Sequence, residues 1–187
     1  MAHFVCPWWL GYFLTSPLRR RLYDPAALLA PFLREGMTVF EPGPGMGFFS
    51  LEIARMIGPK GKLIAVDIQP KMLEALKRKA ERAGLADRII ARLPQSDGMG
   101  IDDFKGRVDF VLAFAMVHEL PDASGFFGET FEALAPKGRM LFSEPVHHVS
   151  AKKFEESIKQ AEALGFKVVA RPEIKSNLSA VLEKAAS

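Results

Sequence analysis

The sequence predicts an α/β fold built on a mostly parallel, doubly wound sheet of seven strands, with helices on both faces and an antiparallel C-terminal hairpin. Three observations predict this fold class. Short apolar runs alternate with segments of helical periodicity along most of the chain. A glycine-rich loop follows the first of these runs, as in nucleotide-binding α/β proteins. The last two apolar runs have no helix between them and should therefore pair antiparallel.

Length and composition favour a single globular domain. The chain has 187 residues, of which 49% are hydrophobic and 25% charged, and its net charge is +3. We expect residues 1–35 to form an aromatic and helical lid segment and residues 36–187 to form the domain itself. The one cysteine, Cys6, excludes a disulfide framework within the chain and is typical of a reducing, cytoplasmic location. No apolar run is long enough for a membrane span, and no signal peptide is recognisable.

The N-terminal segment is unusually aromatic. Residues 4–14 read FVCPWWLGYFL and are followed by Arg19, Arg20 and Arg21. Three interpretations remain open: aromatics packed on the domain, a lid over a substrate pocket, or a peripheral membrane contact in which arginines meet anionic lipid. A short helix is expected over residues 25–34, with Asp24 as its N-cap.

Strands and helices then alternate in order. We expect strands at residues 37–41, 62–66, 88–92, 108–113, 139–143, 166–170 and 178–183. The expected helices cover residues 47–57, 70–83, 124–135 and 151–164. Pro70 and Gly84 mark the start and end of one helix, and Pro136 to Gly138 form a turn before the fifth strand.

The stretch from Met37 to Leu51, MTVFEPGPGMGFFSL, predicts a ligand site. A strand ends on Glu41, and glycines at 43, 45 and 47 follow, which lets a ligand lie against the main chain. Asp67 ends the second strand, 67 − 43 = 24 residues after the first glycine. A carboxylate at that position can accept hydrogen bonds from both hydroxyls of a ribose.

These motifs together resemble those of the class I S-adenosylmethionine-dependent methyltransferases. The run from Val39 to Gly47 resembles their first motif, Ala65 to Ile68 their second, Val108 to Leu112 their fourth strand, and Leu134 to Arg139 the turn before the fifth. The resemblance covers residues 37–143. The run HELPD after the fourth strand, residues 118–122, resembles small-molecule methyltransferases, including arsenite- and quinone-methylating types.

The resemblance implies S-adenosylmethionine as cofactor and assigns residues to its parts. Glu41 and the loop at Gly43 to Gly45 would hold the methionine part, Asp67 the ribose, and Ile68 and Met72 the adenine. Gln95 is the best-placed residue for the adenine amino group, with Asp97 two positions further on. The complete set of expected cofactor-binding residues is Glu41, Gly43, Pro44, Gly45, Asp67, Ile68, Met72, Leu93, Gln95 and Phe114.

Three of the four histidines follow the fourth and fifth strands, at the edge where open α/β sheets bind ligands. We expect His118 to act as a base or to orient the substrate, with Glu119 supporting it and His147 nearby as a further catalytic candidate. The alternative is that these polar residues cap helices and bind loops. A metal site from His118, Glu144 and His147 lacks diagnostic ligand spacing, so no metal is expected.

The expected reaction is in-line methyl transfer to a small or partly apolar acceptor. No motif after the fourth strand matches the amino-methylating enzymes, no nucleic-acid-binding module is visible, and a single cysteine does not supply the set expected of an arsenite enzyme. Two alternatives are a Rossmann-type NAD-dependent oxidoreductase and a non-catalytic nucleotide-binding protein. The acceptor and the oligomeric state do not follow from the sequence.

Overall fold

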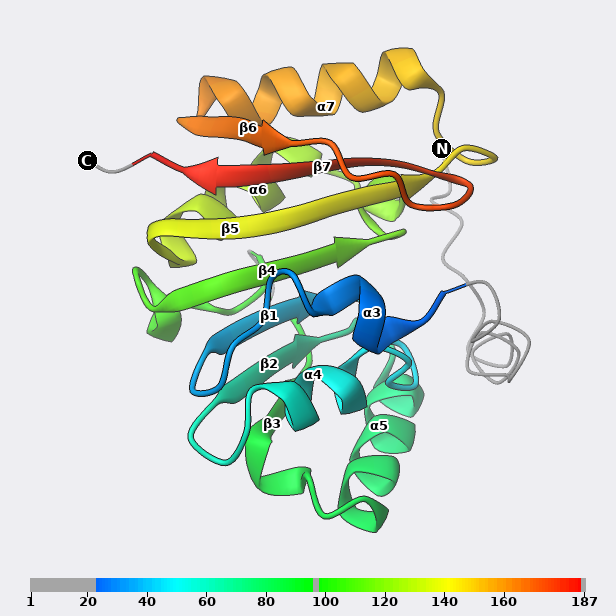
Figure 1. Cartoon of the computed structure of the whole chain (residues 1–187), viewed down its shortest axis with the longest axis vertical. Coiled ribbons are helices and arrows are strands. Elements are labelled where there is room, and N and C mark those ends of the chain that lie inside the picture. The colour runs from blue at the N-terminus through cyan, green and yellow to red at the C-terminus, as the bar shows by residue number, and fades with distance from the viewer. Residues whose placement is uncertain (1–22, 96–97, 186–187) are drawn as a thin grey trace. The chain divides into compact units, whose positions relative to one another are not determined.

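The computed structural model describes residues 23–95 and 98–185, which belong to two compact units (Figure 1). The described part of the first unit covers residues 23–94, and that of the second covers residue 95 and residues 98–185. The aromatic part of the predicted lid, residues 4–14, lies outside the described residues, and the lid stays a prediction.

The first unit is a parallel three-stranded arrangement in the order β3-β2-β1. β1 pairs with β2 from Thr38 opposite Lys62 to Pro42 opposite Val66, and β2 pairs with β3. Both pairings are parallel, so the carboxyl ends of β1 and β2 meet at one edge. The elements are α3 (Pro25–Leu29), β1 (Thr38–Pro42), α4 (Ser50–Met56), β2 (Lys62–Val66), α5 (Pro70–Arg82), the 3₁₀ turn η1 (Ala86–Arg88) and β3 (Ile89–Arg92).

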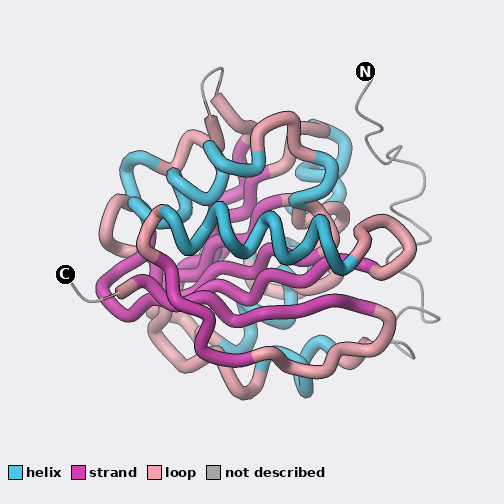
Figure 2. Tube along the Cα trace, turned by 90° about the horizontal axis from the view of Figure 1, so that it is seen from above, coloured by secondary structure: helices cyan, strands magenta, loops and turns pink. Residues whose placement is uncertain are grey.

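The second unit contains four strands in the order β4-β5-β7-β6. β4 and β5 are parallel, whereas β7 pairs antiparallel with both β5 and β6. α7 lies alongside β6, as the long helix at the centre of Figure 2 shows. The elements are η2 (Asp102–Phe104), β4 (Val108–Phe114), η3 (Val117–Glu119), α6 (Ala123–Ala133), β5 (Leu134–Pro145), α7 (Ala151–Ala163), β6 (Phe166–Ala170) and β7 (Asn177–Lys184).

The predicted fold class is confirmed. The seven strands form a mostly parallel sheet, and the two C-terminal strands pair antiparallel as expected. Local signals account for several boundaries: Pro70 occupies the first position of α5, and Gly84 beyond its end adopts φ +66°, a left-handed conformation that glycine tolerates well.

Three element boundaries differ from the prediction by three residues or more. α3 ends at Leu29 instead of residue 34, because Pro31 lacks an N–H and disfavours helix before it. α4 begins at Ser50 instead of residue 47, since Gly47 adopts φ +85°. β5 begins at Leu134, so it includes the predicted turn; its register with β4 shifts there, and Lys137 within the shift has φ +63°.

Apolar side chains from strands and helices form the core of each unit. In the first unit Phe40, Ile64 and Leu76 are fully buried. In the second unit the Phe142 ring stacks on Phe154 at a centroid distance of 4.8 Å and meets Phe127 edge-on at 5.5 Å. These aromatic contacts join β5 to α6 and α7 and fix the strand that carries the polar residues described below.

Candidate functional site

The glycines of the loop after β1 are needed for different structural reasons. Gly43, Gly45 and Gly47 all have positive φ, at +66°, +54° and +85°. A Cβ on Gly45 would meet nothing within 4 Å, so open space lies beside the main chain there. A Cβ on Gly47 would instead lie 2.6 Å from Cδ1 of Leu76, so this glycine lets the loop pack against α5. Pro44 is buried, and its carbonyl accepts a 3.0 Å hydrogen bond from the Gly47 N–H.

Asp67 lies directly after β2 and binds the glycine loop. Its Oδ2 accepts a 3.1 Å hydrogen bond from the Gly45 N–H, and its Oδ1 accepts one of 2.9 Å from the Gln69 N–H. The side chain is largely buried, and this burial raises the pKa of the carboxyl, while the hydrogen bonds from Gln69 and Gly45 oppose part of the rise. Each carboxylate oxygen retains a second lone pair that can accept a hydrogen bond from a ligand hydroxyl.

Glu41 near the end of β1 is almost fully buried, and the Ser50 hydroxyl donates a 2.6 Å hydrogen bond to its Oε2. This contact ties the start of α4 to β1 across the loop. The sequence analysis did not single out Ser50, although its position nine residues after Glu41 and within the expected helix was a usable signal.

The predicted apolar contacts to the adenine divide into two kinds. Ile68 and Leu93 are exposed, at 57% and 47%, and so are free to contact a ligand. Met72 is buried in a cluster with Met46 and Ala75, where it supports the loop from beneath.

Lys79 on α5 is a further loop contact that the sequence did not reveal. Its Nζ donates a 2.9 Å hydrogen bond to the Met46 carbonyl, and partial burial lowers the pKa of the amine. Three hydrogen bonds therefore hold the loop. The Val66 carbonyl accepts from the Gly43 N–H, and Asp67 accepts from the Gly45 N–H. Lys79 donates to the Met46 carbonyl.

These residues fit the nucleoside cofactor that the sequence implies. The buried carboxylate of Asp67 follows β2 and binds Gly45, beside which there is open space. The next residue in the chain, Ile68, has an exposed side chain. They offer in turn an acceptor for sugar hydroxyls, room for backbone approach and an apolar surface for a base. α4 has only seven residues, so we assign the loop contacts and not the helix dipole to this site.

Gln95 and Phe114, the two expected cofactor residues of the second unit, differ in exposure. Phe114 ends β4 and is mostly buried, whereas Gln95 is exposed. The Gln95 N–H donates to the Gly98 carbonyl over 3.0 Å, and the Met99 N–H donates over 2.7 Å to Glu129 on α6. Asp97 lies outside the described residues.

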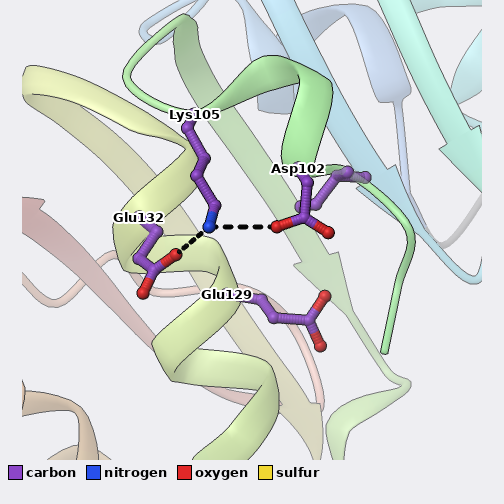
Figure 3. Close-up of a pocket in the computed structure, with 5 residues that line it drawn as sticks. Asp102, Lys105, Glu129 and Glu132 are labelled. Carbon is purple, nitrogen blue, oxygen red and sulfur yellow. Dashed lines mark ion pairs between the residues drawn. The ribbon is translucent and has the colours of Figure 1, made fainter. Parts of the chain in front are cut away.

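An ion-pair network lies next to this segment (Figure 3). Lys105 binds Asp102 at 3.0 Å and Glu132 at 2.9 Å, which joins η2 to α6. Figure 3 shows that the dashed contacts converge on the Lys105 amine, and Glu132 and Asp102 raise the pKa of this amine. The network is exposed and serves to hold the segment after Gln95 on α6.

His118 and Glu144 meet at the carboxyl ends of β4 and β5. His118 Nδ1 forms a short hydrogen bond with Glu144 Oε2, while Glu144 Oε1 accepts from the backbone N–H groups of Val117 at 2.8 Å and His118 at 3.3 Å. The Glu144 side chain is 1% exposed and that of His118 is 20% exposed. Glu144 is the main reason why the pKa of His118 is raised, with burial opposing it.

Ala115 makes this approach possible. It follows β4 with φ +56°, which is strained for a residue with a Cβ, and its N–H donates a 2.7 Å hydrogen bond to the Ser143 carbonyl. The chain therefore turns across the end of β5, and the next residues reach Glu144. Strained backbone of this kind occurs most often at functional sites.

The other catalytic candidates take different places. Glu119 shares the η3 turn with His118 and contributes a weaker electrostatic effect on its pKa than Glu144 does. His147 is exposed, whereas the neighbouring His148 stacks on His118 with ring centroids 5.2 Å apart. Across residues 23–95 and 98–185, no three His, Cys, Asp or Glu side chains gather in a way that could hold a metal ion.

The comparisons with known proteins agree with this geometry. A family model described as a methyltransferase domain matches residues 33–186. The crystal structure of an S-adenosylmethionine-dependent methyltransferase from Aquifex aeolicus is 25% identical, has a TM-score of 0.84, and the match covers 96% of this chain and 99% of that one.

Curated relatives match over shorter stretches. An arsenite methyltransferase of Halobacterium salinarum is 28% identical over 66% of this chain and 30% of its own length. A demethylmenaquinone methyltransferase of Lactococcus lactis is 30% identical over 60% of this chain and 43% of its own length. The chain thus spans less than half of either relative. Within the part of the chain that the structure describes, every helix is too short or too polar to cross a membrane.

Proposed function

Because the chain belongs to the family of S-adenosylmethionine-dependent methyltransferases, we propose that it transfers the methyl group of this cofactor to a small, partly apolar acceptor. The observation that carries the proposal is the bond between Asp67 and the Gly45 N–H. It brings an acid at the end of β2 to the glycine loop after β1, where a nucleoside would need both.

The proposed cofactor contacts divide by chemistry. Asp67 accepts hydrogen bonds from the ribose hydroxyls, and the glycine loop with Glu41 takes the methionine part. Ile68 and Leu93 offer the adenine an apolar surface, and Gln95 binds its amino group. When bound, the cofactor supplies an electrophilic methyl group on a sulfonium, so the protein has mainly to align the acceptor and exclude water.

The proposed catalytic residues are His118, Glu119 and His147. His118 can orient the acceptor or receive its proton, because its ring is partly exposed after β4. Glu119 adds negative charge beside His118, and the exposed His147 is available to a substrate.

The proposal of a small acceptor rests on the resemblance of residues 118–122 to small-molecule methyltransferases and on two named relatives, which act on arsenite and on demethylmenaquinone. An arsenite acceptor is disfavoured, because this chain contains a single cysteine and arsenic binds thiolates. A carbon framework with polar substituents fits better.

Calorimetric titration tests the cofactor. S-adenosylhomocysteine should bind and NAD should not. Asp67→Asn should weaken S-adenosylhomocysteine binding by about 10- to 100-fold, since hydrogen bonds to a charged acceptor contribute about 1.5–3 kcal/mol. Asp87→Asn is the matched control, because Asp87 is exposed and lies in η1 away from the loop. Tighter binding of NAD would contradict the proposal.

A labelling experiment tests turnover. The protein is incubated with S-adenosylmethionine carrying a labelled methyl group and with a fractionated cell extract. Label should enter a low-molecular-weight fraction. Binding of S-adenosylhomocysteine without label in any fraction would instead indicate a non-catalytic binding protein.

A further inference from the structure

The bond between His118 and Glu144 determines the tautomer of the imidazole. A carboxylate can only accept, so Nδ1 must carry the hydrogen in this pair. In the neutral ring Nε2 then holds a lone pair. Among the described residues, no group forms a hydrogen bond to Nε2, and the ring is partly exposed. The lone pair is thus available to a substrate.

Three donors hold the side chain of Glu144 in place. Its carboxylate is buried, yet it accepts from two backbone N–H groups and from the imidazole. A proton gained at Nε2 would place a positive ring against this carboxylate, which stabilises the ring. Among residues 23–95 and 98–185, the titratable groups that act on or stack against the His118 ring are Glu144 from β5, Glu119 from its own turn, and His148.

We propose that Glu144 positions His118 as the proton acceptor of the reaction, and that the methyl acceptor is accordingly a hydroxyl compound such as a phenol or an enol. This inference rests on the proposed function. A hydroxyl is a weak nucleophile until its proton leaves, whereas a thiolate or an arsenite lone pair needs no base. A site that holds a buried carboxylate behind a histidine suits the first class.

The hydroxyl oxygen forms a bond to the methyl carbon, and the carbon–sulfur bond breaks with its electron pair on sulfur, which becomes a neutral thioether. The hydroxyl proton passes to His118 Nε2. The imidazolium that results is paired with Glu144 and later releases its proton to solvent.

The first test uses the protein without any acceptor. Proton NMR follows the His118 ring in the wild type, Glu144→Gln and Glu119→Gln as pH is varied. The wild-type pKa of His118 should lie above the ordinary value, Glu144→Gln should lower this pKa, and Glu119→Gln should lower it less. A larger shift in Glu119→Gln than in Glu144→Gln would overturn the pair.

A measurement on the wild type covers the case in which Glu144→Gln does not fold. Nitrogen-15 NMR above the pKa of His118 should show hydrogen on Nδ1 and none on Nε2. The opposite tautomer would overturn the proposal. Glu144→Asp, which keeps the charge on a shorter side chain, should restore part of the raised pKa if Gln lowers it.

The second test uses the acceptor fraction found by labelling. The rate should rise with pH through the pKa measured for His118, and His118→Gln should lower kcat by about 10²- to 10⁴-fold while S-adenosylhomocysteine binds as before. The methyl group of the product should be on oxygen. A rate that falls through this pKa, or a methyl group on sulfur, nitrogen, carbon or arsenic, would overturn the proposal.

The two proposals fail in different ways. Loss of the proposed function appears as absent S-adenosylhomocysteine binding, or as absence of label in every fraction, whatever the NMR titration gives. Loss of the further inference appears as a wrong tautomer, a wrong pH dependence or a wrong methylated atom, with cofactor binding intact. Bound S-adenosylhomocysteine with no labelled product would count against a hydroxyl acceptor as well.

Discussion

Glu41 places a carboxylate in the interior of the first unit, where a donor must compensate for lost water. The Ser50 hydroxyl is such a donor, at 2.6 Å, and it is itself fully buried. A carboxylate that loses a buried hydrogen bond costs more than a neutral group would, because its charge stays unsolvated. The pair therefore links local stability to the shape of the glycine loop.

We predict that Ser50→Ala lowers the free energy of unfolding by about 1.5–3 kcal/mol, since the buried carboxyl group of Glu41 loses one hydrogen-bond donor. Urea unfolding measures this change. Ser124→Ala is the control, because Ser124 is an exposed serine in α6 and its substitution should change stability by less than about 0.5 kcal/mol. Equal effects of the two substitutions would show that the Ser50 hydroxyl contributes little.

Asp67, unlike the pair of Glu41 and Ser50, lowers the stability of the folded protein when it is ionised. Burial raises the pKa of its carboxyl in the folded protein, so ionisation costs more in the folded than in the unfolded chain. The protonated carboxyl group of Asp67 favours the folded state. This contribution to stability is fully present below the unfolded pKa, about 3.9, and is lost as pH rises through the raised folded pKa. At neutral pH the charge is retained for binding at the expense of stability.

Asp67→Asn should therefore gain stability relative to the wild type as pH rises through the raised folded pKa of Asp67, because only the aspartate then becomes charged. The difference should shrink as pH falls through the raised folded pKa toward the unfolded one, because both proteins are then neutral at this position. Urea unfolding at several pH values tests this. A variant less stable than the wild type at pH 7 would mean that the hydrogen bonds from Gly45 and Gln69 outweigh burial.

At the scale of elements, the loop between β1 and α4 depends on the close approach of α5. Gly47 needs both a positive φ and an absent Cβ, whereas Gly84 needs only the first, because a Cβ there would meet nothing within 4 Å. Substitution of the two glycines therefore separates the effect of backbone conformation on stability from the effect of the packing contact.

Gly47→Ala should destabilise the protein more than Gly84→Ala, by about 1–3 kcal/mol, because the new methyl would overlap the buried Leu76 side chain. Thermal unfolding of both variants gives the difference. The same variant should weaken S-adenosylhomocysteine binding, since the loop must shift. Similar losses at the two positions would assign the whole effect to backbone conformation.

Elements with local signals were predicted well from the sequence. β2 and β6 have the expected bounds, and α5 begins at Pro70 as expected. Elements whose ends depend on tertiary pairing were not, as β5 shows: the sequence around Pro136 to Gly138 reads as a turn, but pairing with β4 begins already at Leu134. Local propensity has no access to such pairing.

At the scale of the whole molecule, some residues of the candidate site are indicated by sequence patterns, whereas others are brought together only by the fold. Glycines at 43 to 47 and the acid at 67 form a spacing pattern, from which the sequence predicts cofactor-binding roles, and the structure brings Asp67 and Gly45 together. The partner of His118 could not, because Glu144 is 26 residues away and the adjacent Glu119 is the more obvious candidate. Only the pairing of β4 with β5 brings the two together.

Cofactor binding should stabilise the folded protein as a whole. S-adenosylhomocysteine at 100 times its dissociation constant should raise the free energy of unfolding by about 2.7 kcal/mol if it binds the folded chain alone. Differential scanning calorimetry over a concentration series measures this. Asp67→Asn should need a higher concentration for the same rise in melting temperature, whereas Asp87→Asn should follow the wild type.

The position of β7 has a consequence for biosynthesis. This strand pairs with both β5 and β6, although it follows both in the chain, and its pairing runs to Glu183 and Lys184. A nascent chain that has emerged from the ribosome only as far as β6 has two strands with edges that still await their shared neighbour. Such edges attract other strands. The second unit should therefore complete its folding only once β7 has emerged from the ribosome.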